Sequence, residues 1–374
     1  MTITLSSNTA WSLYNFRAGL IRALIERNEH VVVLSPHDEF SKRLSQMGCE
    51  VIDLPMDNKG THPQRDTALF MKYRKIYRQL KPSLALHYTI KPVIYGSLAA
   101  HSAGIPCINT ITGLGTAFIR DNWLTRIAEG LYKVSQRNVA QVFFQNNDDM
   151  SLFQERRLVP LDRLQRLPGS GVNLEHFAVT HPPAMSEPTF LLIARLLWDK
   201  GVGEFVEAAR LIKLSHPHAR FQILGALGAA NRTAIPREQL DTWLREGVIE
   251  YLGETDDVRP YITQAHCVVL PSYREGVPRS LLEGGAMGRP LITTDAPGCR
   301  DVVNHEVNGY LCKVQDAVDL SNKIQRFLGL SDEERTLMSN RSSEKVRNEF
   351  DEKLVITRYL DAIDRYRAKP KNRT

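Results

Sequence analysis

The chain has no long apolar run. None of its 374 residues lies in a segment that approaches the roughly 18 consecutive apolar residues of a membrane-spanning helix. The first residues, MTITLSSN, also lack the charged and then apolar layout of a signal peptide. We therefore expect a cytoplasmic protein, with peripheral contact at the inner face of the plasma membrane left open.

Cysteine and metal-binding motifs are equally sparse. No two of the five cysteines are spaced as close metal ligands, and their odd number does not suggest a disulfide framework. The sequence contains no Asp-x-Asp, and the pair His216 and His218 lies in what we expect to be a polar turn. We therefore expect no metal and no cofactor.

The positive charge is unevenly distributed. The net charge is +6, and residues 1–180 hold 21 Lys and Arg against 15 Asp and Glu, whereas residues 181–374 hold 27 against 27. A basic half beside a neutral half indicates an anionic partner such as a phosphate, a nucleic acid or an acidic membrane surface. A solvated basic face that serves solubility is the plainer alternative.

Short β-branched runs alternate with segments of helical period. This alternation predicts βαβ units with parallel sheets, and thus an α/β fold. The rhythm breaks at AVTHPPAMSEP (178–188), which has three prolines, and then restarts. We expect doubly wound domains over 1–178 and 188–350, followed by a helix and tail over 351–374 whose apolar residues allow it to pack back on the first domain.

The segment PSYREGVPRSLLEGGAMGRP (271–290) carries the strongest motif. Glu275 lies in a loop after a predicted strand, and Glu283 lies in the first turns of a helix that we expect to begin near Arg279 or Ser280. Two carboxylates at different heights of one crevice suit sugar hydroxyls, and a helix N-terminus attracts phosphate. Glutamate near a helix start is also favourable by itself, by roughly 0.3–1 kcal/mol. Gly284 and Gly285 inside the helix predict close packing against a strand or ligand.

The Glu-x7-Glu element, together with LLIARLLWDKGVGEFVEAARL and TTDAPGCRDVVNHEVNGYL, resembles glycosyltransferase family 4, whose members are retaining enzymes with the GT-B fold. SSNTAWSLYNFRAGLIRAL, HYTIKPVIYGSLAA and INTITGLGTAF are similar to the branch that builds bacterial O-antigen, capsule and lipid-linked glycans. That branch includes N-acetylgalactosaminyltransferases acting on undecaprenyl-diphosphate-linked sugars. The resemblance implies two facing Rossmann-like domains, a UDP-sugar donor and a polyprenyl-diphosphate-linked acceptor.

The resemblance also implies roles for residues of the second domain. Arg195 and Lys200 match the pair that holds the donor diphosphate, and such cations stabilise a leaving anion. Glu283 matches the ligand of the ribose, and Glu275 matches the ligand of the sugar C3 and C4 hydroxyls. The remaining matches are the phosphate loop and the position that frames the base: Val277, Pro278, Arg279, Ser280 and Gly253. A diphosphate oxygen then takes the acceptor proton, so no protein nucleophile is needed.

In the first domain, the loop Ser7–Trp11 occupies the place of the family's glycine-rich turn. Asn8 and Thr9 stand where glycines are expected, so a close backbone approach to phosphate is less favoured here. We include as further candidates four residues at predicted strand ends or in a glycine turn: His87, Lys91, Thr112 and Gly113. A lone histidine is more often structural, and glycine turns are common.

Two segments have apolar residues at helical spacing with cations around them, FMKYRKIYRQLKP (70–82) and Trp123–Arg137. Each predicts either a core-facing stripe with a basic outer face or a helix that rests on anionic lipid.

Four alternatives to a lipid-linked glycan transferase stay open. A GT-B epimerase or phosphorylase shares the fold but does not explain the Glu-x7-Glu element together with Arg195 and Lys200. A glycosyltransferase with a soluble acceptor and a catalytically dead sugar-nucleotide sensor are also compatible. A nucleic-acid-binding protein is suggested only by the basic first half, which contains no recognisable binding module.

Overall fold

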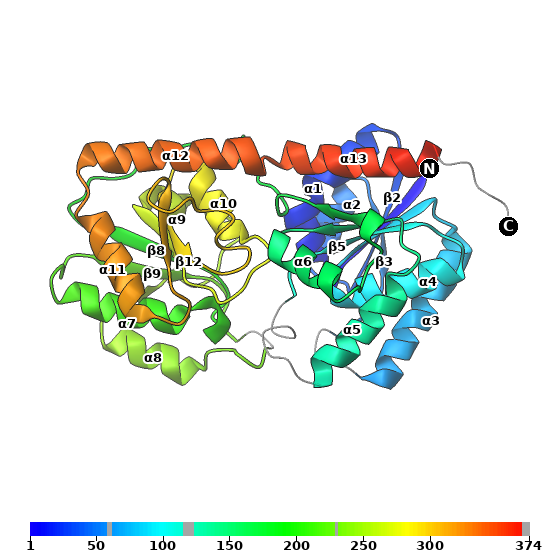
Figure 1. Ribbon diagram of the computed structural model, residues 1–374, viewed down its shortest axis with the longest axis horizontal. Helices are drawn as coiled ribbons and strands as arrows, with labels where there is room; N and C mark the ends of the chain where they lie inside the picture. The colour runs from blue at the N-terminus through cyan, green and yellow to red at the C-terminus, as the bar shows by residue number, and fades with distance from the viewer. Residues whose placement is uncertain (58–61, 115–122, 229–230, 369–374) are drawn as a thin grey trace. The chain divides into compact units, whose positions relative to one another are not determined.

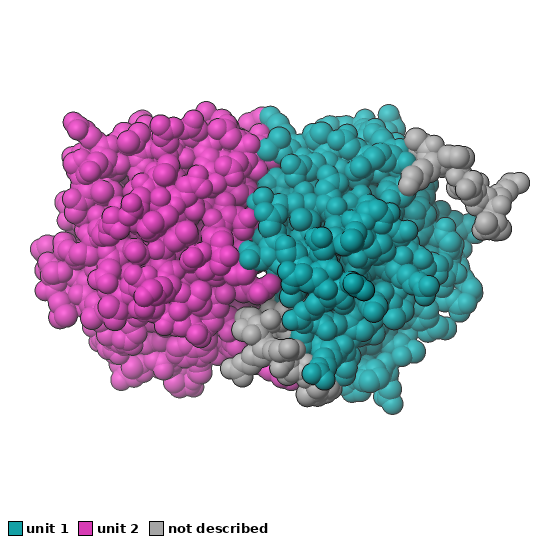
Figure 2. Space-filling model, viewed as in Figure 1, with its two compact units in different colours: residues 1–171, 352–374 teal, residues 172–351 magenta. Residues whose placement is uncertain are grey.

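The computed structural model describes residues 1–57, 62–114, 123–228 and 231–368. The chain divides into two compact units (Figures 1 and 2). Unit 1 consists of Met1–Gly171 with Glu352–Thr374, and unit 2 of Val172–Asp351. No helix of the described residues is long and apolar enough to cross a membrane.

The described part of unit 1 contains a seven-stranded parallel sheet in the order β3-β2-β1-β4-β5-β6-β7. Its strands are β1 (Thr2–Ser6), β2 (His30–Ser35), β3 (Glu50–Asp53), β4 (Leu84–Tyr88), β5 (Cys107–Ile111), β6 (Gln141–Phe144) and β7 (Leu164–Arg166). The central strands are buried on both faces, which explains why runs such as VVVL lack polar alternation.

Helices cover both faces of this sheet (Figure 1). One face is covered by α1 (Ala10–Glu26), α2 (Phe40–Gln46) and α13 (Glu352–Ala368). The other is covered by α3 (Pro63–Leu80), the short π-helix η1 (Pro92–Gly96), α4 (Ser97–Ser102), α5 (Trp123–Ser135) and α6 (Asn147–Glu155). A 3-10 turn, η3 (Leu161–Arg163), leads into β7.

The described part of unit 2 contains a six-stranded parallel sheet in the order β10-β9-β8-β11-β12-β13. Its strands are β8 (Thr189–Ile193), β9 (Arg220–Leu224), β10 (Glu250–Tyr251), β11 (Cys267–Leu270), β12 (Leu291–Thr294) and β13 (Gly309–Cys312). One face is covered by α7 (Val202–Lys213), α8 (Arg237–Arg245) and α11 (Ala317–Leu328), and the other by α9 (Arg259–Gln264), α10 (Arg279–Ala286) and α12 (Asp332–Phe350). The expected pair of doubly wound α/β domains is therefore confirmed.

The last helix, α13, belongs to unit 1, as the sequence predicts. Tyr359 and Ile363 are buried in the same core cluster as Leu13 and Leu20 of α1. The Tyr359 hydroxyl also forms a hydrogen bond with Thr110 at the end of β5. The C-terminal segment thus completes the first unit's core.

The boundary between the units differs from the expected one. Residues 172–188 belong to unit 2, and the chain passes between units at Gly171–Val172. The buried guanidinium of Arg289 holds this segment by donating to the Thr180 carbonyl oxygen (2.7 Å) and hydroxyl (2.6 Å). The three prolines of this segment therefore do not mark a free linker. They lie in an extended segment on the surface of unit 2.

Candidate functional site

The candidate residues of unit 2 gather where its strand order reverses. After β8 the chain moves to β9 on one side, while β11 pairs with β8 on the other. Ligands of open α/β sheets bind outside the carboxyl ends of the strands at such a switch point. Arg195 and Lys200 follow β8 and Glu275 follows β11, so the fold places these three residues at that edge.

Lys200 and Glu275 form an ion pair that the sequence did not predict. The ammonium donates to Oε1 of the carboxylate, and the side chains are 21% and 14% exposed. Arg195 is exposed, and its guanidinium makes no hydrogen bond or ion pair to any described residue. The site therefore presents one neutralised pair and one cation that is available to an anion.

Two glycines allow close contact between the loops that follow β8, β11 and β12. Gly201 has φ +72°, and a Cβ there would lie 2.1 Å from the Pro271 carbonyl oxygen. Gly298 has φ +79°, and a Cβ there would lie 2.4 Å from the Glu275 carbonyl oxygen. The Tyr273 amide also donates to the Asp199 carbonyl oxygen (2.9 Å). Gly201 and Gly298 are site residues that sequence reasoning missed, although their glycine identity was a visible signal.

Helix α10 begins at Arg279, as expected, and its cap residue Pro278 contributes no side-chain cap. Uncapped amides and the helix dipole favour an anion at this end. Val277 is nearly buried beside it, and Ser280 is partly exposed in the first turn.

Glu283 is held by Arg279, whose Nε lies 2.9 Å from Oε1. Burial raises the pKa of the Glu283 carboxyl, and the nearby guanidinium of Arg279 opposes this shift. A hydroxyl donor would satisfy this carboxylate where water does not reach it freely.

The two glycines of α10 pack as predicted. A Cβ on Gly284 would lie 2.7 Å from Val268 of β11, and one on Gly285 would lie 2.7 Å from Val346 of α12. Gly253 has φ +75°, its carbonyl oxygen accepts from the Gly225 amide (2.7 Å), and the space beside its Cα is open. Gly253 therefore lies at the same edge, after β10, with room beside it.

Unit 1 has its own switch point between β1 and β4. The Asn8 amide donates to the Thr89 hydroxyl (3.2 Å), and the Thr9 hydroxyl caps α1 by accepting from the Ser12 amide (3.1 Å). Thr89 has φ +63°, which is rare for a β-branched residue and typical of functional loops. Asn8 and Thr9 thus bond within the unit, and Thr89 is a strand-end residue that the sequence did not single out.

His87 is not available to a ligand, which corrects the expectation. The side chain is fully buried, with Nε2 2.7 Å from the Tyr77 hydroxyl and Nδ1 2.9 Å from Asn109 Oδ1. Burial lowers the pKa of His87 to about 4, against the hydrogen bond with Asn109, which raises it. Its neighbours use both ring nitrogens, so His87 is a structural residue, as isolated histidines usually are.

Lys91 is also buried, which corrects its interpretation as a cation at the site. Its ammonium lies 2.8 Å from Asp66 Oδ1, and the Tyr95 hydroxyl donates to the other oxygen (3.0 Å). Thr112 and Gly113 are partly exposed after β5, and Gly113 has φ +122°. Leu114, the next residue of the predicted turn, is buried, and residues 115–118 lie outside the described residues.

Two Rossmann-like units, each with candidate residues at the switch point of a parallel sheet, define the GT-B class of fold. The structure of HepE from Anabaena in complex with UDP-glucose shares this fold, with a TM-score of 0.80 over 98% of this chain and 100% of that chain at 15% identity.

Two family models match the chain, "Glycosyl transferase 4-like" over residues 2–146 and "Glycosyl transferases group 1" over residues 187–329. The chain belongs to these glycosyltransferases. It is similar to an N,N'-diacetylbacillosaminyl-diphospho-undecaprenol α-1,3-N-acetylgalactosaminyltransferase of Campylobacter jejuni, with 29% identity over 98% of this chain and 99% of the relative. It is also similar to a UDP-Gal:α-D-GlcNAc-diphosphoundecaprenol α-1,3-galactosyltransferase of Escherichia coli, with 24% identity over 76% of each chain.

Proposed function

We propose that this glycosyltransferase is a retaining enzyme that moves a hexose or N-acetylhexosamine from a UDP-sugar to an undecaprenyl-diphosphate-linked saccharide. The product enters a bacterial surface polysaccharide or glycan. The observation that carries the proposal is the set of Arg195, Lys200, Glu275 and the uncapped start of α10 at one edge of unit 2.

In this proposal the donor binds unit 2. Glu283 accepts from the ribose hydroxyls, Glu275 accepts from the sugar hydroxyls, and the residues that start α10 meet the diphosphate. HepE, which shares the fold, was solved with UDP-glucose. A UDP-sugar donor is also named for the E. coli relative.

The chemistry of the proposal is stabilisation of a leaving diphosphate. Glu275 is paired with Lys200 and is thereby poorly suited to act as a free nucleophile. Arg195, Lys200 and the α10 dipole together oppose the negative charge that develops as the glycosidic bond breaks. The acceptor hydroxyl attacks on the face that the diphosphate leaves, and a diphosphate oxygen takes its proton. We propose that this step needs no metal.

The acceptor proposal rests on unit 1. The names of both relatives include a diphosphoundecaprenol sugar. The core-facing side of α3 is apolar, as expected, with Tyr73 and Tyr77 buried. Its outer face exposes cations that have no carboxylate partner among the described residues: Lys72, Lys75, Arg78 and Lys81. Such a face suits the anionic surface of a membrane that carries the acceptor.

The test is a screen of UDP-sugars against synthetic polyprenyl-diphosphate saccharides, with product linkage read by NMR. We expect UDP release only when acceptor is present, an α-linked product from an α-linked donor, and the same rate after EDTA. An inverted product would reject the retaining mechanism. Equal transfer to the soluble saccharide alone would reject the lipid-linked acceptor, and donor turnover without acceptor would favour an epimerase or hydrolase.

A further inference from the structure

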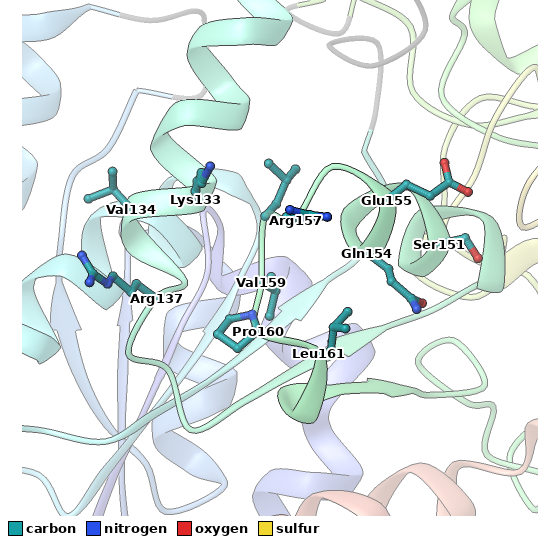
Figure 3. A pocket seen from close by; sticks show the side chains of 11 residues that line it. Lys133, Val134, Arg137, Ser151, Gln154, Glu155, Arg157, Val159, Pro160 and Leu161 are labelled. Carbon is teal, nitrogen blue, oxygen red and sulfur yellow. The ribbon is translucent and has the colours of Figure 1, made fainter.

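A hollow lies in unit 1, away from the strand-end residues Asn8 and Thr89. It has a volume of about 1010 Å³ and lies between the last turns of α5 and α6 and the segment that leads to β7. These helices end where the next strands begin, so the hollow lies at the amino edge of the sheet. Its described lining is Lys133, Val134, Arg137, Ser151, Gln154, Glu155 and residues 157–161 (Figure 3).

Three cations surround this hollow. Lys133 lies in the last turn of α5, Arg137 follows α5, and Arg157 follows α6. None of the three pairs with a carboxylate among the described residues. Glu129 of α5, outside the lining, forms an ion pair with Arg156. Among the described residues that line the hollow, Glu155 is the carboxylate. In Figure 3 the Glu155 carboxylate lies on the far side of the hollow from Lys133 and Arg137.

The backbone places Arg157 at some cost. Arg157 has φ +52° and terminates α6, with its amide donating to the Gln154 carbonyl oxygen (3.1 Å). Glycine or asparagine is the usual residue in this left-handed position, because a Cβ is disfavoured there. This backbone conformation places Arg157 in the lining of the hollow, which Lys133 and Arg137 also line.

Apolar side chains accompany the cations. Leu158 and Val159 are buried in the lining, whereas Val134 and Leu161 are 65% and 63% exposed at its edge. On the same outer face of α5, seven residues before Val134, Ile127 is also exposed. Some of the apolar residues that the sequence analysis found at helical spacing in Trp123–Arg137 are therefore exposed to solvent. A soluble phosphate would leave these aliphatic groups in water, whereas the headgroup region of a bilayer covers them.

We propose that this hollow binds the phosphate headgroup of an anionic phospholipid, with Lys133, Arg137 and Arg157 around the phosphate and Val134 and Leu161 against the upper acyl chains. This lipid site rests on the proposed function, in which the acceptor lies in a membrane. It is separate from the donor residues and from the outer face of α3.

Vesicle sedimentation tests the charge part. The double variant Lys133→Gln/Arg157→Gln is compared with Arg22→Gln/Lys42→Gln, which removes the same charge from exposed positions of α1 and α2 on the opposite face of the sheet. On phosphatidylcholine vesicles containing phosphatidylglycerol, we expect the first pair to lower the partition coefficient about tenfold or more. The control pair is expected to change it far less. Equal losses in both pairs would overturn the site in favour of diffuse attraction.

Fluorescence tests the apolar part. The five native cysteines are buried, so Val134→Cys provides a selective attachment point for an environment-sensitive dye. We expect a blue shift with anionic vesicles and none with inorganic phosphate or glycerol phosphate. A shift caused by the soluble phosphates alone would overturn the assignment of the hollow to a lipid headgroup. The absence of a shift with anionic vesicles would overturn it as well.

Activity separates this inference from the proposed function. The Lys133→Gln/Arg157→Gln variant should transfer sugar to a short-chain, water-soluble acceptor analogue at the wild-type rate. It should be slowed on acceptor embedded in anionic vesicles. If the wild type transfers to no polyprenyl acceptor, the proposed function fails while the vesicle result stands. If transfer occurs and the variant binds vesicles like wild type, only the lipid site fails.

Discussion

Lys200 donates a hydrogen bond to Glu275, although 75 positions separate them in sequence. The pair joins the turn after β8 to the loop after β11, the two neighbours at the switch point of unit 2. A bound diphosphate would compete with Glu275 for the ammonium, and a sugar hydroxyl would then replace the ammonium at the carboxylate. In the proposed function, the pair keeps both groups in place before the donor binds.

Replacing Lys200 with alanine should mainly affect the chemical step. We expect Lys200→Ala to lower kcat at least about a hundredfold, because one charged donor to a developing anion contributes about 2.7 kcal/mol or more. Steady-state kinetics with the identified donor measures this effect. Arg347→Ala, on the exposed side of α12, is the matched control and should keep full activity. Near-normal turnover of pure, folded Lys200→Ala would remove Lys200 from the mechanism.

Replacing Glu283 should act on binding instead. Glu283→Gln keeps the shape but weakens acceptance from ribose hydroxyls, so we expect a raised donor KM with kcat little changed. Because burial raises the pKa of Glu283, donor KM should also rise as pH falls through that pKa, since the protonated carboxyl loses acceptor capacity. The variant should lose this pH dependence, and Glu333→Gln on exposed α12 should retain it. A fall in kcat at constant KM would contradict a holding role.

The glycines between strand-end loops give a test of the loop geometry. Gly298→Ala and Gly201→Ala combine a disfavoured φ with a clash against backbone oxygen. Gly247→Ala, at φ +69° with open space around it, isolates the cost of φ alone. We expect the control to lose about 1 kcal/mol of unfolding free energy and the first two variants to lose more, together with donor affinity. Thermal unfolding and UDP titration measure both, and equal effects in all three variants would show that backbone contact is unimportant.

Much of unit 2 was predictable because local signals agree with the tertiary fold. The alternation of strand-like and helix-like segments predicted the sheet. The loop that ends at Pro278 predicted that α10 begins near Arg279. The Lys200–Glu275 pair was not predictable, since its partners meet only through β8–β11 pairing.

Unit 1 shows where local reasoning ends. His87 lies near the carboxyl end of the buried strand β4, close to where a ligand-binding residue would be, but a helix turn covers it. A Cβ on Gly96 of that turn would lie 2.7 Å from the imidazole. Ile127 and Val134 have core-like spacing but are exposed, because Tyr132 fills the core side of α5 instead. Which side of a helix faces the core depends on packing partners that periodicity does not identify.

The buried network around His87 predicts a pH-dependent stability of unit 1. The Asn109 amide nitrogen donates to Ser97 (2.8 Å) and Gln136 (2.5 Å), so its oxygen accepts from His87 Nδ1–H. Nε2 then accepts from the Tyr77 hydroxyl, and the ring is neutral. Protonation of His87 would place an N–H at Nε2, so that the imidazole and the Tyr77 hydroxyl would both act as donors. The site is closed to water, so no solvent molecule can relieve this conflict.

The sign follows from the two pKa values. The unfolded histidine binds a proton at pH about 6.5, and the folded one only near pH 4. Between these values the unfolded state holds more protons, so stability is full above pH 6.5 and falls as pH drops toward 4, by up to about 3 kcal/mol. Hydrogen exchange of β4 and β5 peptides reports this for unit 1 alone. His87→Gln should flatten the slope while lowering stability at pH 7, whereas the exposed His37→Gln should leave the slope unchanged. A slope that persists in His87→Gln would place the titrating group elsewhere.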